Sequence, residues 1–229
     1  MKVYKVDLVL HDYLFFATTE RGRIAETGAF IHNYALAYAL TFNNLPWQGQ
    51  RNSPPYRHEK QEQHYRDELG AMEMYVTPAK MISGSFALTQ YNTQWEGYMA
   101  VTAQSAGYPN WGFIKSPRPG STYRFYVTSE SEIPSLPTYI RLGKFMSKAK
   151  LTIDRAVKVD RVNGNNLDTE LLLNWNDLEE KPTLFDVIAS ALPTRLIYNA
   201  VFSRVAGARA VFSDGTEVML PLGMGYLRS

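Results

Sequence analysis

The chain has no cysteine among its 229 residues. This excludes disulfides, thiolate nucleophiles and cysteine-based zinc sites, so any catalysis must use histidine, carboxylate, tyrosine, serine or lysine side chains. Long apolar runs are missing too: the longest, residues 35–42, is far shorter than the roughly 20 residues of a membrane-spanning helix. Residues 1–5 lack the apolar core of a signal peptide, and we therefore expect a cytoplasmic protein with no membrane contact.

An overall excess of one charge is also missing, because 24 lysines and arginines nearly balance 22 aspartates and glutamates, for a net charge of +2. Residues 141–161 are the exception: this segment has a charge of +5, and the rest of the chain sums to −3. Its basic residues are Arg141, Lys144, Lys148, Lys150, Arg155, Lys158 and Arg161. Such a local excess is typical of a surface on which a polyanion docks, which points to nucleic acid.

The first half of this segment is the first candidate site. Apolar residues interleave with its cations, so an anchored backbone would present several positive groups outward. A glycine among them would let a phosphate approach the main chain closely. The candidate RNA-binding residues here are Arg141, Gly143, Lys144, Lys148 and Lys150. The alternative is an ordinary solvated strand face.

A second candidate is the Pro/Gly-rich stretch at residues 111–120. Aromatic rings beside cations suit unpaired nucleotides, since the rings stack on bases while the cations meet phosphates. Trp111, Lys115 and Arg118 are the residues expected to do this. The alternative is that Trp111 and Phe113 form an apolar plug under the loop.

A third candidate is a second wall of the RNA site. Arg21 and Arg23 flank a glycine in a charged loop, and His32 interrupts an otherwise apolar helical pattern. These side chains would face RNA at the open edge of the sheet. Alternatively, His32 is a core histidine with its hydrogen bonds satisfied, or a histidine that faces a partner protein.

Signals for catalysis or metal binding are weak. His11 and Asp12 form an HD dipeptide at the end of a predicted strand, without the further ligands that a metal site needs. We expect no metal and no cofactor. A metal-independent ribonuclease remains an alternative, with His11 or His32 as the base, Tyr13 as a second proton-transfer group and a lysine for the developing charge.

Periodicity gives the order of elements. Alternating apolar residues predict a strand at 4–10, and Thr27 is a possible cap for a helix over 28–43. Further strands are predicted at 74–76, 86–91, 98–102, 122–128, 151–162, 196–202, 208–212 and 217–220, with a polar connection at 43–64 and a loop at 105–121. Thr183 is a possible cap for a helix over 184–192, and Asp214-Gly215 predicts a hairpin. We expect one α+β domain over residues 1–229, a ferredoxin-like or RRM-like palm with an inserted β-hairpin arm around residues 86–128.

Several blocks of the chain resemble the Csc-one family, the Cas-five-type subunits of type I-D CRISPR surveillance (Cascade) complexes. The blocks are residues 10–18 (LHDYLFFAT), 26–27 (ET), 32–36 (HNYAL), 119–125 (PGSTYRF) and 140–144 (IRLGK). The resemblance covers nearly the whole chain. One departure is the C-terminal glycine motif of the wider superfamily, which is reduced here to Gly223-Met224-Gly225.

This resemblance implies a member of the repeat-associated RNA-binding (RAMP) superfamily, with an RRM-like palm and a β-hairpin thumb. It implies a non-catalytic subunit that caps the 5′ handle of the CRISPR RNA (crRNA). The implied partners are the first backbone subunit and the large subunit that reads the protospacer-adjacent motif (PAM). The basic surfaces themselves are a second expected contact, for target or PAM duplex DNA, with no residues assigned to reading the motif. Base pairing by the guide would supply the specificity for target DNA in antiviral defence.

Overall fold

A computed structural model describes residues 1–16, 18–21, 24–41, 69–70, 72–93, 110–133, 135–188 and 193–227. Of residues 19–21, 91–93, 110–111 and 163–165 it describes the backbone alone. The expected polar connection at 43–64 and the expected strand at 98–102 lie outside the described residues. No helix in the described ranges has the length and apolar character to cross a bilayer.

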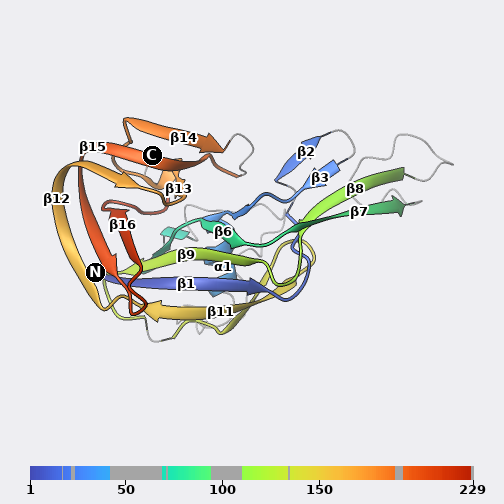
Figure 1. The fold of residues 1–229 in the computed structure, drawn as a ribbon, viewed down its shortest axis with the longest axis horizontal. Coiled ribbons are helices and arrows are strands. Elements are labelled where there is room, and N and C mark those ends of the chain that lie inside the picture. The colour runs from blue at the N-terminus through green and yellow to red at the C-terminus, as the bar shows by residue number, and fades with distance from the viewer. Residues whose placement is uncertain are drawn as a thin grey trace.

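A seven-stranded sheet forms the body of the protein (Figure 1). Its central strand is β1 (Lys2–Leu10), as the alternating pattern predicts, and β9 (Thr122–Ser129) and β11 (Ser147–Arg155) pair with it on either side, both antiparallel. The order is β10 (Tyr139–Leu142), β11, β1, β9, β6 (Ala79–Ser83) and β4 (Phe30–Ile31), with β5 (Met74–Val76) pairing β9 off this path.

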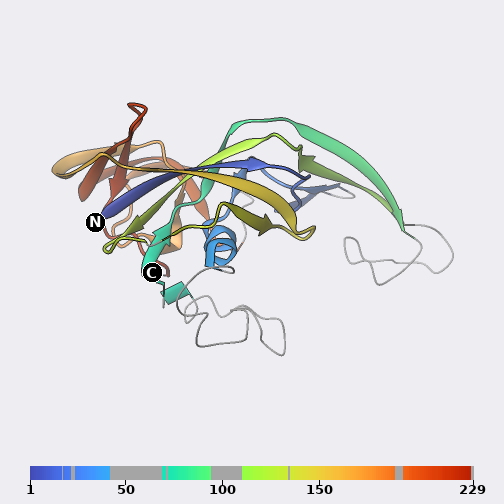
Figure 2. The same ribbon diagram turned by 90° about the horizontal axis from the view of Figure 1, so that it is seen from below.

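One face of this sheet packs on helix α1 (Asn33–Thr41), which lies beneath it in Figure 2. Alternate residues of β1 and β9 enter this core together with the apolar residues of the helix: Val6, Leu8, Leu10, Tyr123, Phe125, Val127, Leu36 and Leu40. The helix is shorter than expected. Its predicted first residues instead form β4, because they pair with β6, and the Thr27 hydroxyl bonds the Phe16 backbone rather than a helix end.

A second, five-stranded sheet curls over one end of the body (left in Figure 1). It consists of β12 (Lys158–Thr169), β13 (Leu173–Asn174), β14 (Leu184–Ile188), β15 (Leu196–Val211) and β16 (Glu217–Pro221). The hairpin at Asp214-Gly215 is confirmed between β15 and β16, with Gly215 at φ +80°. The helix predicted from residue 184 is wrong: residues 184–188 form a strand, since pairing with β15 outweighs the local capping signal.

A hairpin arm extends from the opposite end of the body (Figures 1 and 2). It consists of β7 (Phe86–Thr93) and β8 (Asn110–Pro117), and β3 (Ile24–Glu26) pairs with β8 while β2 (Thr19–Arg21) pairs with β3. Two expectations need correction here. Part of the loop predicted at 105–121 is strand β8, and the arm ends at Pro117 rather than near residue 128, because the apolar residues of β9 belong to the core of the body.

The fold is therefore mostly β, a curled antiparallel sheet with few helices among the described residues. The sequence-based α+β class is correct for a helix packed on a sheet, but it underestimates the share of strand.

Candidate nucleic-acid interface

Three segments meet at the end of the body from which the arm extends: the end of β1, the start of β9 and the β10–β11 turn (Figure 1). Backbone hydrogen bonds connect them. The Leu10 N–H donates to the Ser121 carbonyl over 3.0 Å, and the His11 N–H donates to the Lys148 carbonyl over 2.9 Å. This end is therefore a rigid junction, on which cations from distant parts of the sequence can be held at fixed positions.

Strand pairing places three of the predicted cations on one surface. Arg141 lies opposite Lys148, and Tyr139 lies opposite Lys150. Directly opposed residues share a face of a sheet, and the burial pattern of β11 puts this one on the outside, away from α1. The Lys148 ammonium also lies 4.3 Å from the centre of the Tyr139 ring. This tyrosine was not predicted; its place two residues before Arg141 in an alternating strand was the available signal.

The β10–β11 turn is clamped to the segment that follows β1. Gly143 has φ +71°, and a Cβ there would lie 2.5 Å from the Phe15 carbonyl oxygen. That same carbonyl accepts a hydrogen bond from the Lys144 N–H over 2.9 Å. The close approach at Gly143 is therefore made by the protein's own backbone, which corrects the expected role of this glycine in admitting a phosphate.

Lys144 and Arg118 complete the cluster. Lys144 is exposed on the turn, with its ammonium 5.9 Å from the centre of the Phe15 ring. Arg118 is exposed on the turn between β8 and β9, and its Nε donates to the Phe86 carbonyl. Both turns are attached to the segment that follows β1. The Leu14 N–H donates to the Pro117 carbonyl, and the Gly120 N–H donates to the Leu10 carbonyl. We call Arg118, Arg141, Lys144, Lys148 and Lys150 the cation cluster.

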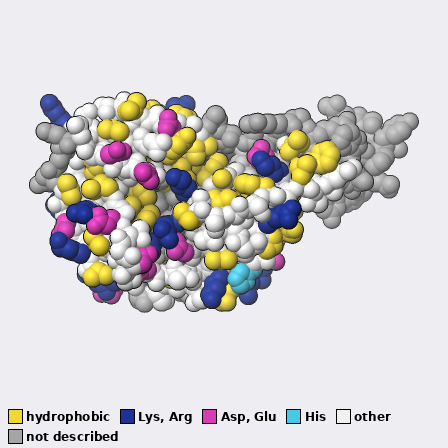
Figure 3. Space-filling model, in the orientation of Figure 1, with side chains coloured by type: hydrophobic (Ala, Val, Ile, Leu, Met, Phe, Trp, Pro, Cys, Tyr) yellow, Lys and Arg dark blue, Asp and Glu magenta, His cyan; other side chains and the backbone are white. Residues whose placement is uncertain are grey.

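No ion pair joins the cation cluster to any carboxylate in the described part of the chain. Elsewhere cations are paired: Lys5 with Asp154 and Asp214, Arg124 with Asp7, and Arg209 with Glu217. Figure 3 shows blue side chains beside a histidine at the lower edge of the body. The cluster therefore keeps its positive charge available to an anionic ligand.

The basic segment does not form one surface. A rise of about 3.3 Å per strand residue puts Lys148 and Arg155 roughly 23 Å apart along β11. Arg155 pairs with Glu132 and Lys158 with Asp160, which neutralises both. Only the first half of the segment belongs to the cation cluster.

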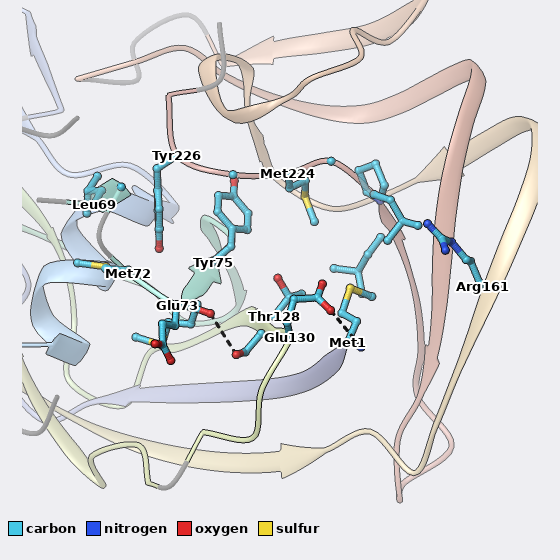
Figure 4. Close-up of a pocket in the computed structure, with 18 residues that line it drawn as sticks. Met1, Leu69, Met72, Glu73, Tyr75, Thr128, Glu130, Arg161, Met224 and Tyr226 are labelled. Carbon is cyan, nitrogen blue, oxygen red and sulfur yellow. Dashed lines mark hydrogen bonds and ion pairs between the residues drawn. The ribbon is translucent and has the colours of Figure 1, made fainter. Parts of the chain in front are cut away.

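Arg161 instead lines a pocket of about 490 Å³ near the N-terminus (Figure 4). The Met1 ammonium lies 3.6 Å from Glu130 there, and Glu73 is a second acid in the wall. The pocket shares no residue with the cation cluster. Two acids in its wall make it a poor site for a polyanion.

The residues predicted on the arm and its neighbours are distributed differently. Lys115 lies on β8 with its ammonium against Glu26, so its charge is neutralised. Trp111 and Arg21 lie on β8 and β2, where only the backbone is described, and Arg23 lies outside the described residues. Of the members of this group whose side chains the structure describes, Arg118 joins the cation cluster and Lys115 does not.

His32 is not part of an exposed wall, because only 6% of it is accessible to solvent. Its Nδ1 accepts a hydrogen bond from the Tyr34 N–H, so Nε2 carries the proton and donates to the Thr194 hydroxyl at 2.8 Å. Burial lowers the pKa of His32 to about 4. It is a neutral structural histidine, as the alternative interpretation held.

His32 belongs to a buried polar network that ends at Asp177. Thr194 donates to Asn174, which donates to Asn33, which donates to the Asp177 carboxylate. That carboxylate also accepts hydrogen bonds from Tyr34, Tyr75 and the Leu227 N–H. Burial raises the pKa of Asp177. The Gly225 N–H also donates to the Asp177 carbonyl, so the segment around Asp177 connects the C-terminal glycine motif to α1, a structural role that no sequence motif indicated.

The groups considered for catalysis are at the same end of the body as the cation cluster. His11 is exposed, and its ring lies 5.9 Å from that of Tyr139 in an edge-to-face arrangement. Asp12 accepts a hydrogen bond from the Lys148 N–H, and Tyr13 is exposed. Within the described ranges no three histidine, aspartate or glutamate side chains gather as a metal site would require.

Comparison with known proteins supports the resemblance in the sequence. The model of a family described as "Type I-D CRISPR-associated protein Cas5/Csc1" matches residues 1–229. A solved structure, a CRISPR protein from Archaeoglobus fulgidus, is similar with 11% identity and a TM-score of 0.48, over 96% of this chain and 100% of that one. This likeness is too distant to carry an argument about function. No curated protein has a matching sequence. The match along its whole length shows that the chain belongs to the type I-D CRISPR-associated Cas5/Csc1 family.

Proposed function

We propose that this chain is a non-catalytic RNA-binding subunit of a type I-D CRISPR surveillance complex, and that its cation cluster holds the 5′ handle of the crRNA. The main observation in support is the cation cluster itself. Its cations have no carboxylate partner among the described residues, and strand pairing and backbone hydrogen bonds fix them on one rigid junction. Because the chain belongs to a family of CRISPR-associated proteins, we expect the anionic ligand to be crRNA.

The body supports this proposal. Within the described residues, β1 lies between β9 and β11 with helix α1 on one face. The second sheet covers the opposite face around Val3 and Tyr126, which leaves the far ends of these strands, beside the cation cluster, available to RNA. The arm would act as the thumb and lie against nucleotides or a neighbouring subunit. We assign the partners accordingly: a backbone subunit, the large subunit, and target or PAM duplex DNA.

The test is the salt dependence of binding. The full chain is titrated against a labelled RNA of the repeat-derived 5′ handle between 50 and 300 mM salt, by fluorescence anisotropy. Each neutralised phosphate of a single strand contributes a slope of about −0.7, so four contacts give roughly −3 in a plot of log K against log salt. A slope near zero, or no binding at low salt, contradicts the proposal.

The enzyme alternative keeps one supporting observation, since His11 and Tyr13 are exposed beside Lys148. Labelled repeat RNA is incubated with the protein in EDTA. Binding without cleavage supports the non-catalytic role. Discrete products that disappear in His11→Ala, with binding retained, support a metal-independent ribonuclease. His32 is not a candidate base, because it is buried in the network with Thr194.

A scaffold that holds protein partners without touching RNA is the third class of function. In that case, crosslinking of the assembled complex would connect crRNA to the neighbouring subunits and never to this chain.

A further inference from the structure

We propose that Phe145 is a stacking platform for one unpaired base of the bound strand. This inference rests on the proposed function. It adds an aromatic residue to the cation cluster, which by itself contacts only phosphates. It starts from an exposed aromatic ring: 58% of Phe145 is accessible to solvent although it lies in a rigid turn.

The turn leaves this ring little freedom to find a buried position. The Met146 N–H bonds the Gly143 carbonyl over 3.1 Å, and the Arg141 guanidinium bonds the Met146 carbonyl over 3.0 Å. Met146 also has φ +52°, a left-handed conformation that is costly for a side chain with a Cβ and that occurs mainly where a fixed geometry is needed. The backbone on both sides of Phe145 is therefore held in place.

Phe145 has an aromatic support on one side. Its ring stacks on Phe15 with centres 4.9 Å apart and planes at 28°, and Phe15 itself is buried. This contact orients the ring and leaves much of its surface to solvent. A flat, oriented and exposed ring is what base stacking requires, since each base presents a π-face of similar size.

The charges around the ring favour a nucleotide over a protein partner. Lys144 is adjacent in the chain, and Arg141 is joined to the turn by its hydrogen bond to Met146. Lysine is depleted in protein–protein interfaces, whereas single-stranded nucleic acid sites combine aromatic faces with lysines and arginines that meet the phosphates. The occupant should be unpaired, because the bases of a duplex are already stacked on one another.

The experiment uses the full chain and a set of short single-stranded RNAs that carry 2-aminopurine at one position each. Stacking on an aromatic ring quenches the fluorescence of this base. We expect quenching at one position, which Phe145→Ala and Phe145→Leu abolish and Phe145→Trp retains. The alanine variant should bind roughly tenfold more weakly, the effect of one lost stacking contact, with an unchanged salt slope.

The controls separate this inference from the proposed function. Lys144→Ala should reduce the salt slope and still show the quenching at saturating protein concentration. RNA binding by the wild type without position-specific quenching, or with Phe145→Leu equal to wild type, overturns the stacking site and leaves the proposed function standing. A wild-type chain that binds no RNA overturns both. If Phe145→Ala impairs assembly with partner subunits but not RNA binding, the ring is a protein contact and the inference is wrong.

Discussion

Arg141 and Lys148 lie directly opposite each other across the β10–β11 pair, two like charges on one outward face. Opposed like charges destabilise a sheet by about 0.2–1 kcal/mol, the range known for cross-strand pairs. Lys148 recovers part of this through its contact with Tyr139, and Arg141 through its bond to Met146. An arrangement that costs stability in the free protein is understandable if a polyanion binds there.

Loss of two cations from the cluster should weaken RNA binding strongly. For Lys144→Ala with Lys148→Ala we expect an affinity roughly 10- to 30-fold lower near 0.1 M salt and a salt slope smaller by about 1.4, from two lost phosphate contacts. Anisotropy titrations measure both. The matched control is Arg155→Ala with Lys158→Ala, which makes the same change in net charge at residues already paired with acids. Equal losses in the two double variants would mean that net charge, not the cluster, determines binding.

Gly143 should tolerate alanine poorly because of both its conformation and its neighbour. Its positive φ disfavours any L side chain by about 1–2 kcal/mol, and the added Cβ would collide with the Phe15 carbonyl. We therefore expect Gly143→Ala to lower the free energy of unfolding by about 2 kcal/mol or more, as measured by urea denaturation. Gly120 also has a positive φ but open space around it, so Gly120→Ala should lose only about 1 kcal/mol. Similar losses would show that the turn can move away from Phe15.

Arg118 and Lys115 are both cations near the base of the arm, but only Arg118 should contribute to binding. Arg118→Gln should weaken binding roughly fivefold near 0.1 M salt and reduce the salt slope by about 0.7. The control is the charge-neutral pair Glu26→Gln with Lys115→Gln, because Lys115 is already neutralised by Glu26. If the salt slope of that double variant is also reduced, Lys115 contacts an RNA phosphate and the prediction is wrong.

His32 should make the protein less stable at acidic pH. Its pKa is lowered to about 4 in the fold, against about 6.5 in the unfolded chain, so between these values the unfolded state binds more protons. The contribution of neutral His32 to the free energy of unfolding is therefore fully present above pH 6.5. It is lost as the pH is lowered toward 4, by roughly 3 kcal/mol in total. Urea denaturation at several pH values measures this. In His32→Gln the slope over this range should be much smaller. If its slope equals that of the wild type, the acid sensitivity comes from other groups.

Local patterns in the sequence were enough for several features. The alternation at residues 4–10 predicts β1, and Asp214-Gly215 predicts the β15–β16 hairpin, because the period of a strand and the preference of a turn need only a few adjacent residues. The four cations between 141 and 150 are also visible in the sequence, since they are close along the chain. The predicted helix at 184–192 failed because its signal was one cap, whereas strand β14 depends on pairing with β15.

The sequence by itself determined the central strand β1, the β15–β16 hairpin, the family and the excess of cations that distinguishes residues 141–161 from the rest of the chain. Only the tertiary structure decided which of those cations are available, because an ion pair such as that of Arg155 with Glu132 depends on how the two segments are placed in space. It also moved His32 from the expected RNA wall into a buried network with Thr194 and Asp177, and placed Phe15 against Gly143. The contacts of His32 with Thr194 and of Phe15 with Gly143 join residues more than a hundred positions apart. Their geometry follows from how the sheets and α1 pack, which no local pattern records.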